Sequence, residues 1–408
     1  MVFDTSSTIA VVGASLAGLR AAETLRAEGY GGRIVLIGAE IHEPYDRPPL
    51  SKQLLAGSWG LDRVRLRDPE KIAALGLDLR LGHAATAMDV AGHTLDLDDG
   101  DRLEFDGAVV ATGAHARTLP DTAHLAGVHT LRTLEDCFAI GAELSGSSRL
   151  VVVGAGFIGS EVAATCRGLG VEVTVVEALP VPLSRVLGDR MGAVCAALHA
   201  DHGVDVRAGV GVSRLVSEDS GGGAKVTGVA LVDGTVIPAD VVVVGIGVAP
   251  TTQWLADSGL EVGDGVRADA TLHAADDVVV AGDLARWFDN RLGSEIRIEH
   301  WTNAAEQGVA AARSLLAGRG GADAYSPVPY FWSDQYDTKI QVIGHPRPDD
   351  EIVVVEGSLE ERRFVALYGR GGRLTAALGF SRPRQLMGFR PLVEAGVSLD
   401  EARGQQPA

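Results

Sequence analysis

The sequence predicts an α/β fold with two parallel βαβ halves followed by a C-terminal α+β domain. Two glycine-rich turns predict the halves, in IAVVGASLAGLR (Ile9–Arg20) and LVVVGAGFIGSEV (Leu150–Val162). Each turn follows an apolar run and precedes a helix-like stretch. Beyond residue 322, alternating apolar and polar residues indicate an antiparallel sheet instead. The length of 408 residues also exceeds one ordinary core.

The first half contains one helix, from the glycine turn to about Glu28, and several strands. These strands are Ile9–Val12, Ile34–Ile37, Asp78–Leu81, His93–Leu97 and Phe105–Gly113. Around Leu150 the order restarts with a strand, a glycine turn and a helix at Ser160–Leu169. Its further strands are Val173–Val176 and Val241–Gly247. The chain then returns to the first half. This part contains a third strand that ends in small residues, Val278–Asp283, and a helix at Asn303–Leu316.

The remaining residues predict the C-terminal domain. Its strands are Lys339–Ile343, Ile352–Glu356, Phe364–Tyr368 and Leu374–Phe380, with a helix at Pro391–Ala395. The chain therefore divides into residues 1–115, an inserted domain at 116–245, a return at 246–322 and the last domain at 323–408. The first two domains are expected to be Rossmann-like, because a dinucleotide pyrophosphate needs close approach to backbone N–H groups at a helix N-terminus.

The second turn is the more regular one. Gly154, Gly156 and Gly159 complete the pattern GxGxxG, and Glu177 ends the next strand. A carboxylate there accepts hydrogen bonds from both ribose hydroxyls and repels a 2′-phosphate, so NADH is expected rather than NADPH. The alternative is that Glu177 is a solvated strand-end charge.

The first turn departs from that pattern. Gly13, Ser15 and Gly18 place a serine where the pyrophosphate comes closest. A small hydroxyl can fit there or donate to a phosphate. The following strand ends at Gly38, and Glu40 comes two residues later, so its carboxylate is less well placed than that of Glu177.

Composition excludes several classes. The net charge of −18 argues against nucleic acid as a partner, and no uninterrupted apolar run is long enough to span a membrane. A cytoplasmic location is the expectation. Cys137, Cys166 and Cys195 form no CxxC or CxxxxC pair, so neither a redox disulfide nor a metal site is expected, and Cys166 is expected to be a buried thiol.

Five further motifs point to one family. They are EPYDRPPLSK (Glu43–Lys52), ATG (Ala111–Gly113), AGD (Ala281–Asp283), EHWTNAAEQ (Glu299–Gln307) and FWSDQY (Phe331–Tyr336). With them the chain resembles the FAD-dependent, NADH-linked ferredoxin reductases of bacterial oxygenase systems. The resemblance implies a glutathione-reductase-like arrangement, with FAD on segments 1–115 and 246–322 and NADH on 116–245.

The resemblance also implies which residues bind FAD. They are Gly13, Ser15, Ala17, Gly18, Glu40, Arg47, Lys52, Ala85, Thr112, Gly113, Arg132, Asp283 and Trp301. Ala17 and Glu40 would lie along the adenosine half and Ala85 beside the adenine. Arg132 would lie near the diphosphate. Asp283 would accept ribityl hydroxyls, with a helix N-cap for the stretch from Leu284 as its alternative, and Trp301 would lie at the pyrimidine end.

Lys52 and Glu161 are the implied catalytic pair, on different domains. In the family pattern such a lysine lies near the flavin N5, paired with this glutamate, and stabilises reduced, anionic flavin. An interdomain ion pair without catalytic effect is the alternative. Because the chain lacks a cysteine pair, electrons are expected to leave from the flavin edge, where the resemblance places Trp332. The alternative for Trp332 is a core residue of the last sheet.

The implied partner is a 2Fe–2S ferredoxin, which receives electrons one at a time; a monomer or weak dimer is expected. Between Arg362 and Arg390 there are seven arginines and no acidic residue. We hypothesise that part of this stretch steers an acidic ferredoxin, and a solvated face or intramolecular pairing is the alternative. An NADH oxidase or disulfide reductase is a second class, which needs a redox cysteine. A flavoprotein like apoptosis-inducing factor is a third, which typically has basic surfaces.

Overall fold

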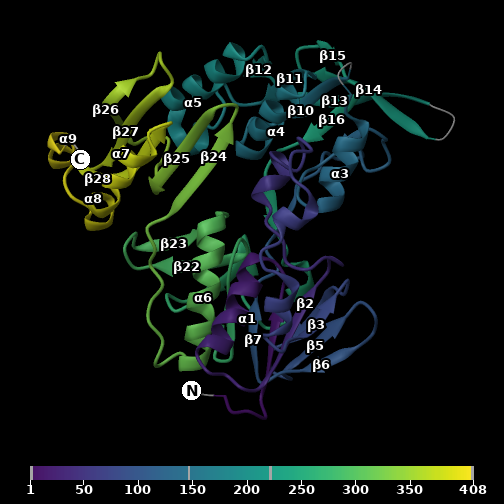
Figure 1. Ribbon diagram of the computed structural model, residues 1–408, viewed down its shortest axis with the longest axis vertical. Coiled ribbons are helices and arrows are strands. Elements are labelled where there is room, and N and C mark those ends of the chain that lie inside the picture. Colours follow the sequence, from purple (N-terminus) through teal and green to yellow (C-terminus); the bar gives the residue numbers. More distant parts are fainter. Residues whose placement is uncertain (1–2, 146–147, 220–222, 406–408) are drawn as a thin grey trace. The chain divides into compact units, whose positions relative to one another are not determined.

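The computed structural model describes residues 3–145, 148–219 and 223–405 (Figure 1). The chain forms two compact units, each with its own parallel sheet and glycine turn, which confirms the predicted α/β class. Unit 1 contains Met1–Asp46, Leu61–His115 and Ala249–Pro327, and unit 2 contains Arg47–Gly60, Ala116–Val248 and Val328–Ala408. Two short strands, β8 (Ala114–Ala116) and β17 (Val248–Pro250), lie at the boundaries between these segments.

The central sheet of unit 1 has the strand order β20-β21-β7-β1-β2-β3. Its strands are β1 (Thr8–Val12), β2 (Arg33–Gly38), β3 (Asp78–Leu81), β7 (Gly107–Val110), β20 (His273–Ala275) and β21 (Val278–Val280). Its strands run parallel except for β20, which pairs antiparallel with β21. The apolar runs of β1, β2, β7 and β21 are buried, as parallel strands covered on both faces require. Two helices, α1 (Leu16–Ala27) and α6 (Trp301–Ala317), lie side by side against this sheet (Figure 1).

Smaller elements complete unit 1. One antiparallel sheet contains β4 (Ala85–Asp89), β5 (Thr94–Leu97) and β6 (Arg102–Glu104). Another contains β18 (Val262–Gly263), β19 (Gly265–Ala268), β22 (Ala285–Asp289) and β23 (Ser294–Arg297). The short helices are α2 (Pro69–Ala73), η2 (Leu61–Val64) and η3 (Gln253–Leu255). Because a strand begins at Ala285, the N-cap alternative for Asp283 is wrong.

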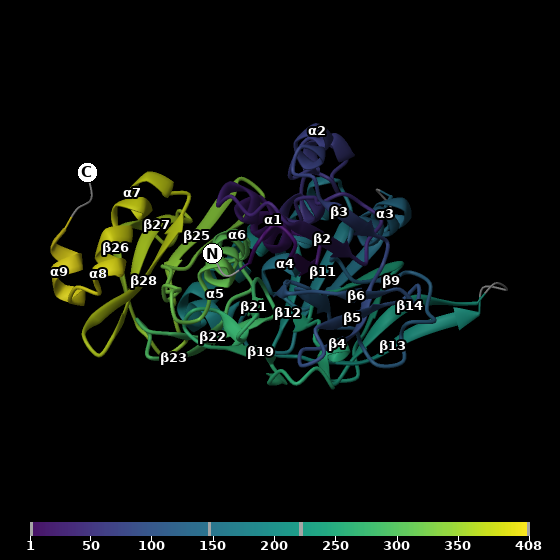
Figure 2. The ribbon, with the colours of Figure 1, turned by 90° about the horizontal axis from the view of Figure 1, so that it is seen from below.

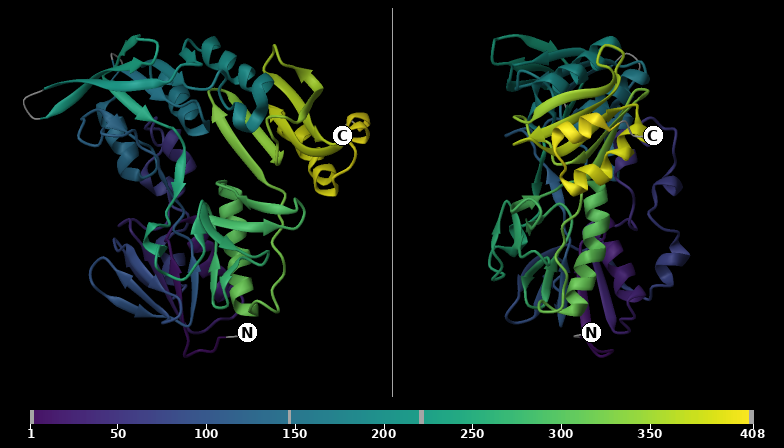
Figure 3. Two further views of the ribbon diagram at one scale, coloured as in Figure 1. Left: turned by 180° about the vertical axis from the view of Figure 1, so that it is seen from behind. Right: turned by 90° about the vertical axis from the view of Figure 1, so that its left-hand side faces the viewer.

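The parallel sheet of unit 2 has the order β12-β11-β10-β16-β9. Its strands are β9 (Val128–His129), β10 (Arg149–Val153), β11 (Glu172–Glu177), β12 (Asp205–Ala208) and β16 (Val241–Val244). The helices around it are α3 (Leu134–Glu143), α4 (Phe157–Gly168) and α5 (Ser184–Asp201), with η1 (Pro48–Ser51). A separate sheet, which projects from this part of the ribbon (Figure 3), contains β13 (Val212–Asp219), β14 (Ala224–Leu231) and β15 (Val236–Pro238).

The C-terminal part of unit 2 is one antiparallel sheet of order β24-β25-β28-β27-β26. Its strands are β24 (Tyr330–Gln335), β25 (Thr338–Gly344), β26 (Glu351–Ser358), β27 (Arg363–Arg370) and β28 (Arg373–Phe380). Three helices, α7 (Pro383–Gly388), α8 (Arg390–Ala395) and α9 (Leu399–Gly404), cover one face (Figure 2). Apolar residues of α5 pack against the other face. The edge strand β24 therefore belongs to one core with helix α5 of unit 2.

Segment Arg47–Gly60 belongs to unit 2, although the sequence assigns it to the first domain. Its helix η1 contacts α3 and α4, and the Cys137 Sγ donates to the Leu50 carbonyl at 3.3 Å. The assignment of segments to individual nucleotides stays a prediction.

Candidate functional site

Both glycine turns are built by the same close contacts. Gly13 has φ +118° and Gly154 has φ +101°, which favour glycine. A Cβ on Gly13 would lie 2.1 Å from the Ala111 carbonyl oxygen, and one on Gly154 would lie 2.4 Å from that of Gly245. Each turn donates its first backbone N–H to the neighbouring strand, at 2.7 Å in both cases. The first glycine of each motif is therefore required by the turn itself.

The third glycine of each turn is required by helix packing. A Cβ on Gly18 would lie 1.9 Å from the Gly13 carbonyl oxygen, and one on Gly159 would lie 2.2 Å from that of Gly154. A backbone oxygen cannot move aside as a flexible side chain can, so both positions exclude alanine.

The middle position is different, because the protein's own packing does not require glycine there. The nearest atom to a Cβ on Gly156 is the Gly245 carbonyl oxygen at 4.0 Å. Gly156 is the N-cap of α4, so backbone N–H groups open toward this space. The site fits a pyrophosphate that approaches the helix N-terminus. Ser15 is the N-cap of α1, and its side chain makes no capping hydrogen bond to the helix.

Glu177 lies where the sequence predicts, at the end of β11, and its carboxylate contacts the glycine turn. Its two oxygens accept hydrogen bonds from the backbone N–H groups of Ala155 and Leu179, each at 2.8 Å. The charge is thus held beside the turn and keeps acceptor capacity for hydroxyl groups. The solvated-charge alternative does not describe this side chain, which is only partly exposed.

The first turn has no such carboxylate at the equivalent place. Gly38 ends β2, and a Cβ there would lie 2.6 Å from the Cβ of Ala14. Glu40 lies two residues later and accepts a hydrogen bond from the Tyr45 hydroxyl. Ala17 is buried in α1, where its carbonyl oxygen would lie 2.3 Å from a Cβ on Gly308 of α6.

Other predicted residues of unit 1 lie at the carboxyl ends of its central strands. Thr112 and Gly113 follow β7, and Asp283 follows β21, the adjacent strand, as a partly buried residue. This edge is where open α/β sheets bind ligands. The Thr112 hydroxyl donates to the Thr251 carbonyl at 2.8 Å. Ala85 begins β4.

Trp301 begins α6 and is 37% exposed. Its indole Nε1–H donates to Asp46 Oδ1 at 2.6 Å, which fixes the ring orientation. Arg47 and Arg132 belong to unit 2, where the Arg47 guanidinium donates to the Arg132 carbonyl at 2.5 Å. Asp136 in turn accepts the Arg132 backbone N–H at 2.7 Å. The binding role of each of these residues stays a prediction.

Lys52 and Glu161 form a buried ion pair inside unit 2. Lys52 Nζ lies 2.6 Å from Glu161 Oε2, with side-chain exposures of 11% and 4%. The Ser51 hydroxyl donates to the same oxygen at 2.5 Å, and the Ser333 hydroxyl donates to Oε1 at 2.8 Å. The Gln335 side-chain amide donates to the Ser333 oxygen at 3.2 Å. The implied pairing is present, whereas the expected interdomain arrangement is not, because both residues belong to one compact unit.

Sequence reasoning selected Lys52 and Trp332 but missed Ser51, Ser333 and Gln335. The two serines stand next to selected residues, inside PPLSK and FWSDQY. Their signal was weak, since a lone serine in a motif does not indicate what it contacts 110 or 172 residues away.

Trp332 lies on the edge strand β24 and is partly exposed. Its ring stacks on Tyr330, with centroids 6.1 Å apart. Consecutive residues of a strand point to opposite faces, so Phe331 and Ser333 face the helices. There Phe331 packs on Phe157 of α4 with ring centroids 5.0 Å apart. Trp332 is therefore not a fully buried core residue.

The three cysteines are buried and lie on different helices, α3, α4 and α5. Burial raises the pKa of the Cys137 thiol to about 11, and that of Cys166 and Cys195 to about 12. Thiols with such pKa values are inert at neutral pH. The expectation of a buried Cys166 is confirmed.

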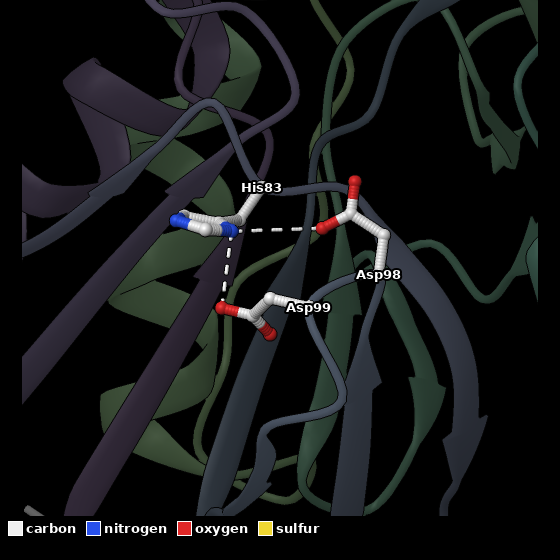
Figure 4. A group of neighbouring side chains, drawn as sticks. All are labelled: His83, Asp98 and Asp99. Carbon is white, nitrogen blue, oxygen red and sulfur yellow. Dashed lines mark ion pairs between the residues drawn. The ribbon is translucent and has the colours of Figure 1, made fainter.

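One cluster of the described residues has the atoms to hold a metal ion, namely His83, Asp98 and Asp99 (Figure 4). His83 Nδ1 lies 3.6 Å from Asp98 Oδ1 and 3.1 Å from Asp99 Oδ2. The two carboxylates are exposed. Ion pairing accounts for this arrangement whenever the imidazole is protonated, so the cluster carries no metal assignment.

Most of the arginine stretch is engaged within unit 2. Arg370 lies 2.7 Å from Asp350, Arg362 lies 3.1 Å from Asp201, and Arg382 lies 3.5 Å from Glu356. Arg373 donates to the Gly396 carbonyl. Intramolecular pairing to acidic residues, the alternative weighed for this stretch, accounts for three of the seven, and the Gly396 contact engages a fourth. The remaining arginines are Arg363, Arg384 and Arg390.

Comparison with known proteins identifies the family. Residues 7–308 match the family described as pyridine nucleotide-disulphide oxidoreductase, and residues 330–408 match the reductase C-terminal family. The chain belongs to the pyridine nucleotide-disulphide oxidoreductase family. It is thus an oxidoreductase, and the resemblance that the motifs indicate is confirmed. Within the described residues, no helix combines the length and apolar character needed to cross a membrane.

Members of this family that resemble the chain cover it almost completely. Rhodocoxin reductase of Rhodococcus erythropolis is 36% identical over 394 residues, 96% of this chain and 90% of that protein. The ferredoxin–NAD(+) reductase component of the anthranilate 1,2-dioxygenase system of Burkholderia cepacia is 38% identical over 401 residues, 97% of this chain and 96% of that protein. The crystal structure of the covalent putidaredoxin reductase–putidaredoxin complex superposes with a TM-score of 0.93 at 33% identity, covering 99% of this chain and 97% of that chain.

Proposed function

We propose that the protein is an NADH-dependent ferredoxin reductase that supplies electrons to a monooxygenase or dioxygenase. The observation that carries this proposal is two glycine turns of one backbone design on a chain whose three cysteines are buried, separate and inert. Electrons from NADH then have no disulfide to reduce. The relatives named as ferredoxin reductases of oxygenase systems support the same conclusion.

FAD is the second dinucleotide, and NADH binds the regular turn. When bound, flavin accepts a hydride and releases electrons singly, which matches a two-electron donor to one-electron acceptors. The balanced reaction is NADH with two oxidised ferredoxins, giving NAD⁺, two reduced ferredoxins and one proton. Glu177 favours NADH through its charge, since it repels a 2′-phosphate.

The chain's own residues have distinct tasks in this reaction. The turns of Gly154–Gly159 and Gly13–Gly18 bind the two pyrophosphates. The Lys52 ammonium, fixed by Glu161, supplies positive charge where negative charge develops on reduction. Trp332, partly exposed on an edge strand, contributes to the electron exit toward the ferredoxin.

The partner is a 2Fe–2S ferredoxin that binds transiently. Arg363, Arg384 and Arg390 are the members of the arginine stretch best suited to attract an acidic ferredoxin, because the other four make intramolecular contacts. We also propose a cytoplasmic location. The disulfide-reductase class is disfavoured, since it needs a thiolate that these buried cysteines do not provide.

Anaerobic titration of the purified yellow protein tests this proposal. NADH is expected to bleach the flavin absorbance faster than NADPH, and a panel of 2Fe–2S ferredoxins should contain efficient acceptors. Trp332→Ala is expected to slow ferredoxin reduction while leaving flavin reduction by NADH unchanged. Stoichiometric reduction of disulfide substrates with no ferredoxin turnover would contradict the proposal.

A further inference from the structure

The ion pair of Lys52 and Glu161 is attached to strand β24 through one hydroxyl group. Ser333 Oγ donates to Glu161 Oε1, whereas Ser51 and Lys52 both converge on Oε2. Glu161 is 3% exposed and Ser333 is fully buried. In such a dry setting each hydrogen bond is strong, and each lost one is costly.

The Gln335 side-chain amide supports the direction of the Ser333 hydrogen bond, which the acceptor-only carboxylate of Glu161 requires. A serine hydroxyl has one proton to donate. Because the Gln335 amide donates to Ser333 Oγ, that proton is directed to Glu161. Gln335 is itself fully buried two residues along the same face of β24.

A carboxylate whose first oxygen is fixed has a fixed plane, so its second oxygen has a defined position. The Lys52 ammonium needs an acceptor in a fixed position, because a lysine carries its charge on a flexible four-carbon stem. Ser51 also contacts Oε2, and its carbonyl accepts a hydrogen bond from the Thr165 hydroxyl at 2.7 Å, so it ties the pair only to α4, the helix that carries Glu161. Ser333 therefore connects the pair to a separate element, strand β24.

We propose that Ser333, oriented by Gln335, is a positioning residue that holds the Lys52 ammonium in place through Glu161. Strand β24 then contributes to both flavin reduction and electron exit. Ser333 faces the ion pair, and the adjacent Trp332, the proposed exit residue, faces away from it. This inference rests on the proposed function for the catalytic use of Lys52, but the geometric claim stands apart from it.

Competitive amine labelling of the holoenzyme tests the geometric claim. The chain has four lysines, Lys52, Lys71, Lys225 and Lys339, so acetylation by a hydroxysuccinimide ester can be followed at each by mass spectrometry. Lys71 is 69% exposed and Lys339 is 43% exposed, against 11% for Lys52. We expect Lys52 to react slowest in the wild type and at least threefold faster in Ser333→Ala, with the other three unchanged.

Two further variants control the experiment. Ser160→Ala removes another buried serine hydroxyl from α4, one with no hydrogen-bond partner among the described residues, and should leave Lys52 labelling unchanged. Ser333→Thr keeps the hydroxyl and should return Lys52 labelling toward the wild-type rate. Equal labelling of Lys52 in Ser333→Ala and Ser160→Ala would overturn the proposal, as would a folded Ser333→Thr that behaves like Ser333→Ala.

Rapid mixing with NADH then tests whether the position of the Lys52 ammonium affects the rate of flavin reduction. Ser333→Ala should slow flavin reduction about tenfold without changing NADH affinity, because small misplacements of a catalytic group are costly. Lys52→Ala separates the two claims. If Lys52→Ala reduces flavin at the wild-type rate while Lys52 labelling still responds to Ser333→Ala, the catalytic use of Lys52 fails and its positioning by Ser333 stands.

Discussion

The two glycine turns share a backbone and differ in what reaches the nucleotide. In both, the first glycine lies against a neighbouring carbonyl and the third lies against the first. Val12 and Val153 occupy equivalent registers, each paired with the two strands beside it. The backbone of the two turns is therefore the same. A difference in ligand must come from the side chains around each turn.

That difference lies at the end of the second strand of each βαβ motif, β2 in unit 1 and β11 in unit 2. In unit 2 this place holds Glu177, whose carboxylate accepts the Ala155 N–H. In unit 1 it holds Gly38, where a side chain would collide with Ala14. A carboxylate beside the turn suits the adenosine ribose of NADH and repels the 2′-phosphate of NADPH, whereas Gly38 offers the first turn no such side chain. The two turns thus differ by one residue at matching positions, and we predict that this residue fixes the second turn to NADH.

The largest expected effect comes from the third glycines. Gly18→Ala and Gly159→Ala each force a Cβ into a backbone oxygen, at a cost of about 3 kcal/mol or more. We expect Gly18→Ala to be purified without flavin, and Gly159→Ala to keep its flavin but lose reduction by NADH. Flavin absorbance and anaerobic NADH titration measure these outcomes. Equal flavin loss in both variants would break the distinction between the turns.

Gly156→Ala should lower NADH affinity without lowering the stability of the fold. Its Cβ meets open space, so the melting temperature is expected to stay within about 2 °C of the wild type. NADH affinity should fall about tenfold, or ~1.4 kcal/mol, because the methyl group occupies the space for the pyrophosphate. Calorimetry and NADH binding check the two parts. Loss of stability comparable with that of Gly159→Ala would show that the middle position is structural.

Glu177→Gln should sharpen the assignment of the second turn to NADH. We expect the ratio of kcat/KM for NADPH to that for NADH to rise about fivefold, or ~1 kcal/mol, since the repulsion of a 2′-phosphate is removed. The ratio cancels any distortion of the turn, which both nucleotides share. Glu40→Gln is the matched control in the first turn and should leave the ratio unchanged. A similar ratio change in both variants would contradict the assignment.

Ser15→Gly is expected to have the smallest effect. It restores the regular GxGxxG pattern in the first turn, and the Ser15 side chain makes no capping hydrogen bond to α1. FAD affinity of the apoprotein should change less than threefold. A larger loss, measured by flavin fluorescence, would mean that the hydroxyl contributes a phosphate contact.

The features that local sequence determines were predictable. Both βαβ units, the turn glycines and Glu177 follow from apolar runs and fixed spacings. Helix α5 escaped prediction because Gly188, with φ 74°, interrupts its pattern. The partners of Glu161 escaped because tertiary packing alone brings Ser51 and Ser333 to it. The pairing of Lys52 with Glu161 came from family resemblance, and no spacing rule would have supplied it.

A crystal structure of the protein with FAD and NAD⁺ tests the central claim most directly. We expect the FAD pyrophosphate at Gly13–Gly18 and the NAD⁺ pyrophosphate at Gly154–Gly159, with Glu177 hydrogen-bonded to the NAD⁺ adenosine ribose. Density for NAD⁺ at the first turn, or a Glu177 carboxylate with no contact to the ribose, would contradict it.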